Sequence, residues 1–510
     1  MEGIDERKAP KPWRLPATSM AWRLFLSAWI IFSLHFATDI VREHYPAIAL
    51  GDHFTFRLDE YSGLHPDLFE KPGYGWHIGN NPGVSMLAAI PYALARPLID
   101  RINDRVVAGR MARGEAEPPA FDSPRTRSAN FFAETYRRGI DVKLGLAAFV
   151  THAFLMAPSS AVGVVLIFLG LRWATRSDRL ALLLALLYGF GTPVFFRTGF
   201  LNHNLMLGHI AFAGFLALWN PGGRDRPSIG WRHFLAGLAG GTAILFDYSG
   251  VVFLLGLFGY ALGKRFAEAS ARDALRHGAL YVLGTLGPVF LLWFYQWRSF
   301  GNPFLPGQNW MPPVEYIDRG YQGYSAPQLD LLLSLGFDQR FGLFTMAPAL
   351  VFGFFAPLVA RKADSGLPRL EMWVCLLLFT ALWVFFAGNN YSNLQWNTGV
   401  RYMAAGIPFL FVPAAIVLLR MPRPLFAAVA LVSVVINWSA AMHREVWHPT
   451  GVFGPVISVL TGGFELPALT TLSRMQMFGS IVEHGVSPLP LMVLAAVIIA
   501  IIWQPADGRV

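Results

Sequence analysis

The apolar run PGVSMLAAIPYALARPL, residues 82–98, decides the topology of the chain. It is nearly long enough to cross a bilayer as a helix, for which about 20 residues are needed. If it does cross, every later loop moves to the opposite side of the membrane. The composition of the chain and the charges of its loops settle which of the two arrangements we expect.

The composition is that of a polytopic membrane protein. Of 510 residues, 54% are hydrophobic and 14% are charged, whereas soluble proteins carry roughly a quarter charged residues. Apolar runs of about 18 residues or more recur along the chain, and each can span a bilayer as a helix. The net charge of +9 comes from short basic loops between these runs. It therefore indicates membrane topology and no nucleic-acid partner.

We expect an all-α polytopic membrane protein with about twelve transmembrane helices, interfacial helices and long outer loops. With the N-terminus inside, the expected spans lie near residues 18–38, 145–171, 179–197, 203–219, 232–247, 249–263, 276–297, 341–360, 369–387, 402–420, 423–442 and 488–504. Every short inner loop then carries Arg or Lys, as the positive-inside rule requires. The first apolar run is long and lacks an A-x-A cleavage site, so we expect a retained first helix.

This count holds only if residues 82–98 stay out of the bilayer core, because a span there would place the basic loops outside. We therefore expect an interfacial helix at this run, within a first outer loop of residues 39–144. Two more long outer loops follow at 298–340 and 443–487, and residues 1–510 form one membrane-embedded domain. Long ordered loops on a membrane scaffold usually carry function.

The first outer loop opens with the stretch SLHFATDIVREHYPAIALGDHFTFRLDEY, residues 33–61, in which Asp39 ends the first span. A carboxylate at the edge of hydrocarbon is costly unless it is paired or functional. Asp39 is therefore our candidate general base. The alternative is that Asp39 only caps the helix that follows it, which is a favourable N-cap placement.

The same loop holds many side chains of the types that bind metals. They are Asp52, Asp59, Glu60, Asp67, His44, His53, His65 and His77. Carboxylates and imidazoles suit a divalent cation, but no HExxH or calcium-loop spacing is present. We expect most of these residues to solvate the loop or to contact a polar substrate. A divalent metal is an alternative that the sequence does not favour, and no other cofactor is indicated.

Two arginines break the positive-inside pattern. Arg340 in FDQRFGLF and Arg401 in NTGVRYMAAG each come just before a span that enters from the outer side. A guanidinium at that depth can bind a phosphate with two parallel hydrogen bonds. The alternative is that each arginine only reaches toward lipid headgroups.

Other polar and aromatic residues lie at outer helix ends. His203 and Asp247 are candidates to orient a substrate or to pair with an arginine, although a purely structural hydrogen bond is the simpler account of each. Tyr402, Trp396 and Tyr391 are candidates to stack on a sugar ring. Interfacial aromatics are also expected as membrane anchors.

Taken in order, these segments resemble the GT-C superfamily of integral-membrane glycosyltransferases. The similarity is greatest to bacterial relatives of the protein O-mannosyltransferases and the lipid A aminoarabinose transferases. TDIVREHYPAIALGDHFTFRLDEY, residues 38–61, looks like their pattern of an acidic residue, a short helix and an extended segment ending in Asp59 and Glu60. NNPGVSMLAAIPYAL, residues 80–94, looks like an interfacial helix that often opens with His-Pro-Pro or Lys-Pro-Pro, and here has Asn81 instead.

Later segments extend the resemblance over most of the chain. FLNHNLMLGHIAF, GNPFLPG, DQRFGLFTMAPAL and NTGVRYMAAGIPFL are similar to a Ser/Asn-His helix opening and to Gly-Asn-Pro-Phe, Arg-Gly-Leu-Phe and Pro-Arg-Tyr segments. Two departures are clear. The Asp-Glu pair of the mannosyltransferases is Asp39-Ile40 here. The Lys-Pro-Pro segment reads Asn81-Pro82-Gly83, although a Glu-Lys-Pro sequence occurs earlier, at residues 70–72.

The resemblance implies transfer of one sugar from a polyprenyl-phosphate donor to an acceptor hydroxyl on the periplasmic face of a bacterial inner membrane, both termini being cytoplasmic. The acceptor would be a cell-envelope glycan, lipid or protein. Asp39 would take the acceptor proton, and Arg340, Arg401, His203, Asp247, Tyr402, Asp59, Glu60 and Asn81 would bind substrates.

Two other functional classes of membrane protein remain as alternatives. About twelve spans also suit a secondary transporter or flippase of a lipid-linked sugar, but transporters usually place polar residues at the midplane in two related halves. Here the polar groups gather at one face, and no matching halves are seen. The other class is an oligosaccharide ligase, which would use the same chemistry on a larger donor.

Overall fold

The chain is built almost entirely from helices. The structure is a computed structural model that describes residues 20–123, 125–221, 229–313, 320–360, 366–392, 400–443, 451–478 and 486–504. Of the described residues 74% are helical, and the sole sheet among them is a two-stranded hairpin. The all-α expectation is therefore confirmed.

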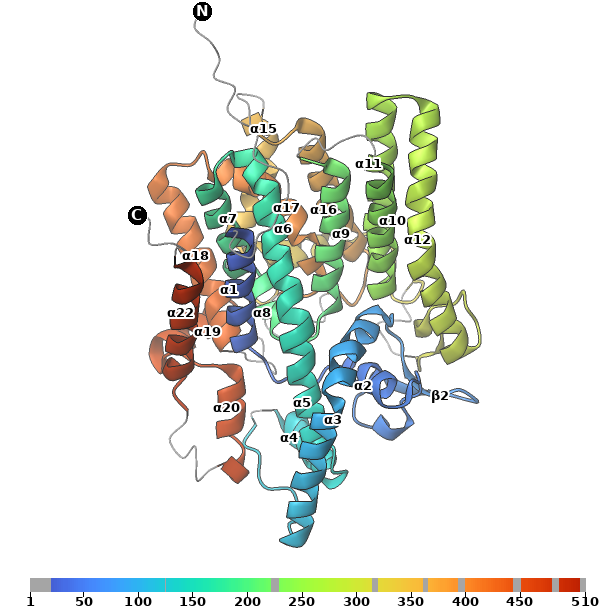
Figure 1. Cartoon of the computed structure of the whole chain (residues 1–510), viewed down its shortest axis with the longest axis vertical. Helices are drawn as coiled ribbons and strands as arrows, with labels where there is room; N and C mark the ends of the chain where they lie inside the picture. The colour runs from blue at the N-terminus through green and yellow to red at the C-terminus, as the bar shows by residue number, and fades with distance from the viewer. Residues whose placement is uncertain are drawn as a thin grey trace, which may run out of the picture.

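The elements follow one another in a simple order along the chain (Figure 1). The first half contains α1 (Met20–Leu34), α2 (His44–His53), β1 (Leu68–Lys71), β2 (Gly75–Ile78), α3 (Gly83–Ala112), α4 (Thr126–Arg137), α5 (Asp141–Thr151), a π-helical turn (His152–Met156), α6 (Ala157–Thr175), α7 (Asp178–Phe190), α8 (Val194–Thr198), α9 (His203–Trp219), α10 (Ile229–Phe246), α11 (Gly250–Glu268) and α12 (Ala271–Phe300). The second half contains α13 (Leu329–Phe337), α14 (Leu343–Met346), a 3-10 segment (Pro348–Phe355), α15 (Ala356–Ala360), α16 (Arg369–Ala387), η6 (Tyr402–Gly406), α17 (Ile407–Leu418), α18 (Arg423–Met442), α19 (Phe453–Gly462), α20 (Pro467–Ser473) and α22 (Leu489–Trp503).

Each of the twelve expected spans contains helical structure, but not all of it is long enough to cross a membrane. Among the described residues, five helices can cross by length and composition, namely Asp141–Thr175 as one run, α11, α12, α16 and α18. The bent pair α19–α20 makes a sixth if it is counted as one span. The helices thus indicate a membrane protein with five or six such spans, and the count of twelve remains a prediction.

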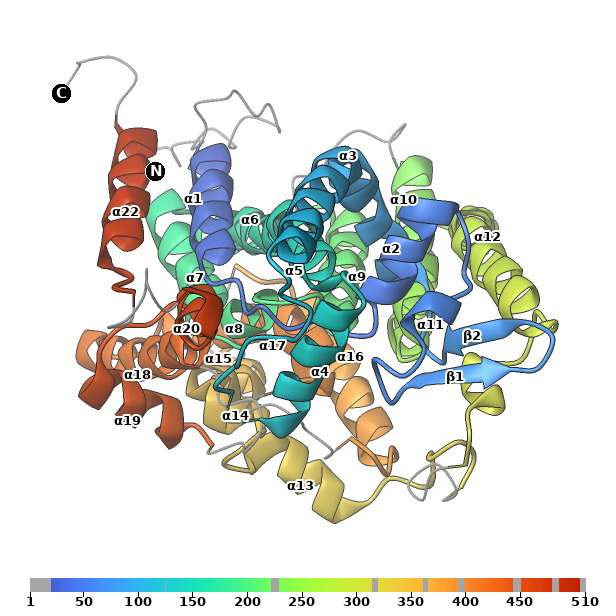
Figure 2. The ribbon, with the colours of Figure 1, turned by 90° about the horizontal axis from the view of Figure 1, so that it is seen from below.

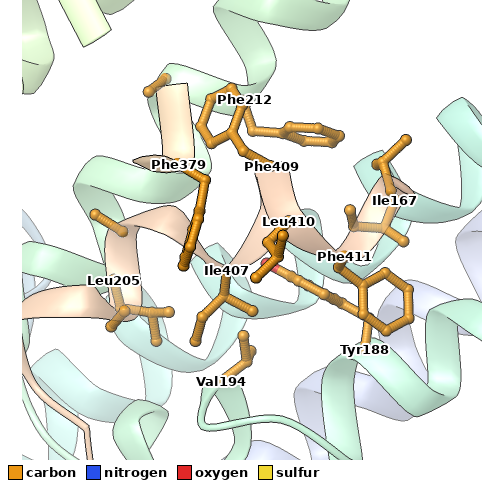
Figure 3. Packing of buried hydrophobic residues seen from close by; sticks show 14 of the residues in the cluster. Ile167, Tyr188, Val194, Leu205, Phe212, Phe379, Ile407, Phe409, Leu410 and Phe411 are labelled. Atoms are coloured by element: carbon orange, nitrogen blue, oxygen red, sulfur yellow. The ribbon is translucent and has the colours of Figure 1, made fainter. Parts of the chain in front are cut away.

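The core is organised around α17, which is buried on every side. Phe409 stacks on Phe253, with ring centroids 5.0 Å apart, and meets Phe212 edge-on at 5.6 Å. Figure 3 shows Phe212, Phe379 and Tyr188 from neighbouring helices around α17. Because α17 continues from η6, this packing also fixes the segment that begins at Arg401.

A glycine brings η6 against α9. A Cβ atom at Gly208 would lie 2.7 Å from the carbonyl oxygen of Ala405, which is closer than real Cβ contacts allow. Only glycine permits this approach between the two backbones. The contact lies near the first turns of both elements, so residues 401–402 and His203 lie at the same end of the molecule.

The run that decides the topology forms the start of α3. The helix extends to Ala112, well beyond residue 98, and it is not among the helices that meet the criteria for a span. It packs against α2, where a Cβ atom at Gly51 would lie 2.4 Å from the Tyr92 ring. The elements of the first loop gather at one end of the helical bundle, as Figures 1 and 2 show. The interfacial position of α3 remains a prediction.

Candidate functional site

A cavity of about 1770 Å³ opens at the end of the bundle where the first loop lies. Typical small-molecule pockets measure about 300–1,000 Å³, so this cavity has room for more than one ligand group. Its walls come from the segment after α1, from α4 and α5, from the start of α9, from residues 401–402 and from α20. These segments are far apart in the sequence.

Asp39 lies half-buried in the wall of this cavity. The backbone before it is fixed at two points, because the Ala37 N–H donates to the Gly199 carbonyl at 2.8 Å and the Thr38 hydroxyl meets the Thr471 hydroxyl at 2.8 Å. Thr38 has a φ of 54°, in the left-handed region that most residues avoid. The segment therefore turns sharply just before Asp39.

The capping alternative for Asp39 is wrong. Helix α2 begins at His44 and its N-cap position is occupied by Glu43, whose side chain makes no capping hydrogen bond. Asp39 thus lies several residues before the helix, in irregular backbone that faces the cavity. Irregular backbone can direct a side chain without meeting the constraints of a helix.

Glu43 forms the centre of a buried polar cluster that the sequence did not reveal. It is 4% exposed. Its Oε1 accepts hydrogen bonds from Asn80 Nδ2 at 2.9 Å and from His203 Nδ1 at 3.0 Å. The other ring nitrogen of His203 lies 3.5 Å from Asp247 Oδ2. His203 is thereby held between two carboxylates, Glu43 behind it and Asp247 at the cavity.

Arg42 joins this cluster to Asp67, which directly precedes β1. It pairs with Asp67 and lies 3.4 Å from Glu43 Oε1. Burial opposes ionisation of Glu43, but the charge of Arg42 and the hydrogen bond from His203 outweigh it and hold the pKa of Glu43 well below its usual range. Burial likewise opposes ionisation of Asp67, and Arg42 again outweighs it and lowers the pKa of that carboxyl.

Arg401 faces the same cavity from η6. Its guanidinium lies 5.0 Å from the ring centre of Tyr402, and both residues line the cavity. Within the part of the chain that the structure describes, Arg401 forms no ion pair, although its charge helps to lower the pKa of Glu43 and of Asp67. A guanidinium so placed can receive an anionic ligand.

A second arginine positions the first. Arg197 is 2% exposed, lines the cavity and donates from Nε to the carbonyl of Val400. It thus fixes the backbone directly before Arg401. Arg197 does not stand out in the sequence, because it ends an apolar run and resembles an ordinary basic residue at a helix end.

Four predicted site residues lie outside the cavity lining. Arg340 is exposed and pairs with Asp338, with Nε and Oδ1 3.4 Å apart. Asn81 is buried and donates to the Ile244 carbonyl at 2.6 Å, which ties the start of α3 to α10. Asp59 and Glu60 are exposed on the first loop.

Asp59 has a local structural role. Its carboxylate pairs with Arg57 at 2.9 Å and accepts the backbone N–H of Trp76 at 2.9 Å. Of the aromatic candidates, Tyr391 and Tyr402 line the cavity. Trp396 lies outside the described residues.

One group of metal-binding side chains exists within the described ranges. Ligand atoms of Asp52, His53 and Glu60 lie within 4.8 Å of one another. However, the Asp52 carboxylate is already engaged by Lys143 at 2.6 Å and by Arg96 at 3.0 Å. A cation would have to compete with both, so this group does not fit a resident metal.

No family model, curated protein or solved structure matches this chain. The function therefore has to be argued from the site. The cavity combines a half-buried carboxylate, Asp39, an available guanidinium, Arg401, and the His203–carboxylate cluster. Such an arrangement offers a proton acceptor and a cation for an anionic ligand within one cavity.

Proposed function

We propose that the protein is a glycosyltransferase that moves a single sugar from a polyprenyl-phosphate donor to an acceptor hydroxyl. The observation that carries the proposal is the placement of Asp39 and Arg401 in one cavity, at the end of a bundle of apolar helices. The similarity of the surrounding segments to GT-C glycosyltransferases supports it. The acceptor is a cell-envelope glycan, lipid or protein.

In the proposed reaction Asp39 takes the proton of the acceptor hydroxyl as that oxygen attacks the anomeric carbon of the donor. The bond from the anomeric carbon to the phosphate oxygen breaks, and the polyprenyl phosphate leaves with its electron pair. Arg401 stabilises the negative charge that develops on the leaving phosphate. Direct displacement inverts the anomeric centre.

Glu43 and His203 act as positioning residues in this scheme. Glu43 is engaged by a guanidinium, an imidazole and an amide, so it is a weak proton acceptor. Its ionised carboxylate fixes the His203 ring, which in turn faces Asp247 at the cavity wall. Asp247 and Tyr402 then contact the sugar or its phosphate.

The test is donor turnover by the purified protein in lipid nanodiscs, with a panel of polyprenyl-phosphate sugars and an acceptor-containing extract. Asp39→Asn should lower the release of polyprenyl phosphate by about 10²–10⁴-fold, the usual contribution of a general base. The matched control is Asp104→Asn, an exposed carboxylate on α3 outside the cavity. Equal loss in both variants, or no turnover of any donor by the wild type, would reject the proposal and favour sugar transport or transfer of a larger glycan.

We also propose that the cavity faces the periplasm of a bacterial inner membrane, with both termini in the cytoplasm. The basic short loops support this orientation. Cys375, the one cysteine of the chain, is buried, so a cysteine introduced at Ser123 in the cavity wall can be labelled selectively. A membrane-impermeant maleimide should label Ser123→Cys in intact spheroplasts. Labelling only after membrane disruption would reverse the assigned orientation.

A further inference from the structure

The outer wall of the cavity carries a group of arginines that the proposed reaction does not use. Arg125 and Arg127 lie at the start of α4, Arg474 follows the end of α20, and all three line the cavity. We call Arg125, Arg127 and Arg474 the basic wall. Figure 1 shows α4 and α20 at the same end of the molecule.

The basic wall is held together by backbone pairing between two distant segments. Phe121 and Met475 form an antiparallel bridge. Around it, the Asp122 N–H donates to the Arg474 carbonyl at 2.9 Å and the Gln476 N–H donates to the Ala120 carbonyl at 3.0 Å. These bonds fix the backbone of Arg474 beside the segment that leads into α4.

Most of the other cavity arginines are neutralised within the protein. Arg110 binds Asp141 through two hydrogen bonds of 2.8 Å, Arg138 binds Glu134 at 2.8 Å, and Arg42 pairs with Asp67. These pairs are internal and leave little charge for a ligand.

Two members of the basic wall, Arg127 and Arg474, differ in this respect. Among the described residues the side chains of Arg127 and Arg474 make no ion pair or hydrogen bond, and both are exposed. The charge of Arg474 acts on the carboxylate of Glu465. That carboxylate already contacts the His443 ring at 3.3 Å and the Thr470 hydroxyl at 3.3 Å. The wall thus presents at least two uncompensated cations to the cavity.

We propose that the basic wall is a second anion site, which binds a phosphate group through the guanidinium groups of Arg127 and Arg474. Two planar forks suit the oxygens of a phosphate, and each can form two parallel hydrogen bonds. The phosphate belongs either to a soluble phosphorylated glycan or to the headgroup of an anionic phospholipid. The site is built from segments other than those of Arg401, so it exists whether or not the proposed sugar transfer takes place.

The test measures phosphate binding directly and needs no turnover. Wild-type protein in neutral phosphatidylcholine nanodiscs is titrated with inorganic phosphate and with glucose 1-phosphate by isothermal calorimetry. In a second arm, native mass spectrometry counts phosphatidylglycerol molecules retained from mixed nanodiscs. Both arms use wild type, Arg127→Gln/Arg474→Gln, the control Arg101→Gln/Arg105→Gln on the exposed part of α3, and Arg401→Gln.

The expected result is a loss of at least about tenfold in affinity in Arg127→Gln/Arg474→Gln, because charge-assisted hydrogen bonds contribute strongly to binding. The control should retain this binding, whereas Arg401→Gln should lose only the phosphate bound at Arg401 and keep the binding that depends on Arg127 and Arg474. Loss in the calorimetric arm identifies soluble phosphate as the ligand class, and loss confined to phosphatidylglycerol retention identifies a lipid headgroup. Equal behaviour of the basic-wall variant and the control in both arms would overturn the proposal.

Discussion

A buried glutamate from another part of the chain lies at each end of α9, and the two glutamates have different surroundings. At the first residue of the helix, His203 contacts Glu43. Near its last residues, Glu371 accepts hydrogen bonds from the Tyr260 hydroxyl at 2.7 Å and from Lys264 at 3.0 Å. Both glutamates are 4% exposed, so burial and charge are matched.

The two glutamates differ in the direction that their polar partners face. Lys264 also donates to the carbonyls of Leu218 and Trp219, at 3.3 and 2.9 Å, and so closes the end of α9. None of these residues lines the large cavity. The Glu43 cluster, in contrast, opens on that cavity through Asp247. A buried charge therefore marks a candidate site only where part of its network faces a space that a ligand can enter.

The largest effect is expected at the closed end. Glu371→Ala should lower the free energy of unfolding by about 3–5 kcal/mol, because it leaves the partly buried Lys264 without its counter-charge. Turnover by the protein that remains folded should be unchanged. Chemical unfolding followed by tryptophan fluorescence measures the first quantity, and donor release per folded molecule the second. If Glu371→Ala is as stable as wild type, the Glu371–Lys264 pair does not have the structural role assigned to it.

A smaller effect, but on activity, is expected at the open end. Glu43→Gln should reduce turnover by about 10²-fold, because misplacement of neighbouring groups by about 1 Å costs that much. Stability should change less than in Glu371→Ala, since Arg42 keeps Asp67 as a partner. The control is Glu117→Gln, an exposed residue between α3 and α4. If Glu43→Gln reduces only stability, both ends of α9 are structural.

Arg401 and Arg340 are equal candidates by sequence, but their substitution should have different effects on donor binding. Arg401→Ala should weaken donor binding by about 10- to 100-fold, which corresponds to the loss of a hydrogen bond to a charged group. Arg340→Ala should leave donor binding unchanged, because Arg340 is exposed and pairs with Asp338. Binding of a fluorescent polyprenyl-phosphate analogue measures both. An equal loss of donor affinity in both variants would indicate that Arg340 also binds the donor.

The smallest effect concerns pH. Burial lowers the pKa of His44 and of His65, each to about 4, whereas both titrate near 6.5 in the unfolded chain. Between pH 6.5 and 4 the unfolded state binds more protons, so stability is lost as the pH falls through this window. Hydrogen exchange should show the cavity end losing protection before the Lys264 end. His44→Gln/His65→Gln should reduce this pH dependence, and an unchanged slope would assign it to other groups.

The helices could be predicted from the sequence because each apolar run carries its own signal. Residues 203–219, 369–387 and 423–442 are helical with the expected bounds. Their number of crossings could not be predicted in the same way, because α9 and α17 are apolar yet shorter than a spanning helix. Apolar composition alone does not separate a helix buried in protein from one that contacts lipid.

The site was predictable in part. Asp39, Arg401, His203, Asp247 and Tyr402 line the cavity, and each was distinguished by its place at a helix end. Glu43 was missed since it follows Arg42 in a stretch that resembles ordinary solvated charge. Its main partner, His203, lies 160 residues away along the chain. The pairing of residues 120–122 with 474–476 was likewise invisible to local patterns.

That last pairing has a consequence for how the protein is made. Synthesis proceeds from the N-terminus, so residues 120–122 leave the ribosome long before residues 474–476 exist. The backbone hydrogen bonds of residues 120–122 to residues 474–476 can therefore form only after nearly the whole chain has been inserted. The cavity is therefore completed at the end of biogenesis, and a chain cut short before residue 474 would carry Asp39 and Arg401 in an unfinished chamber.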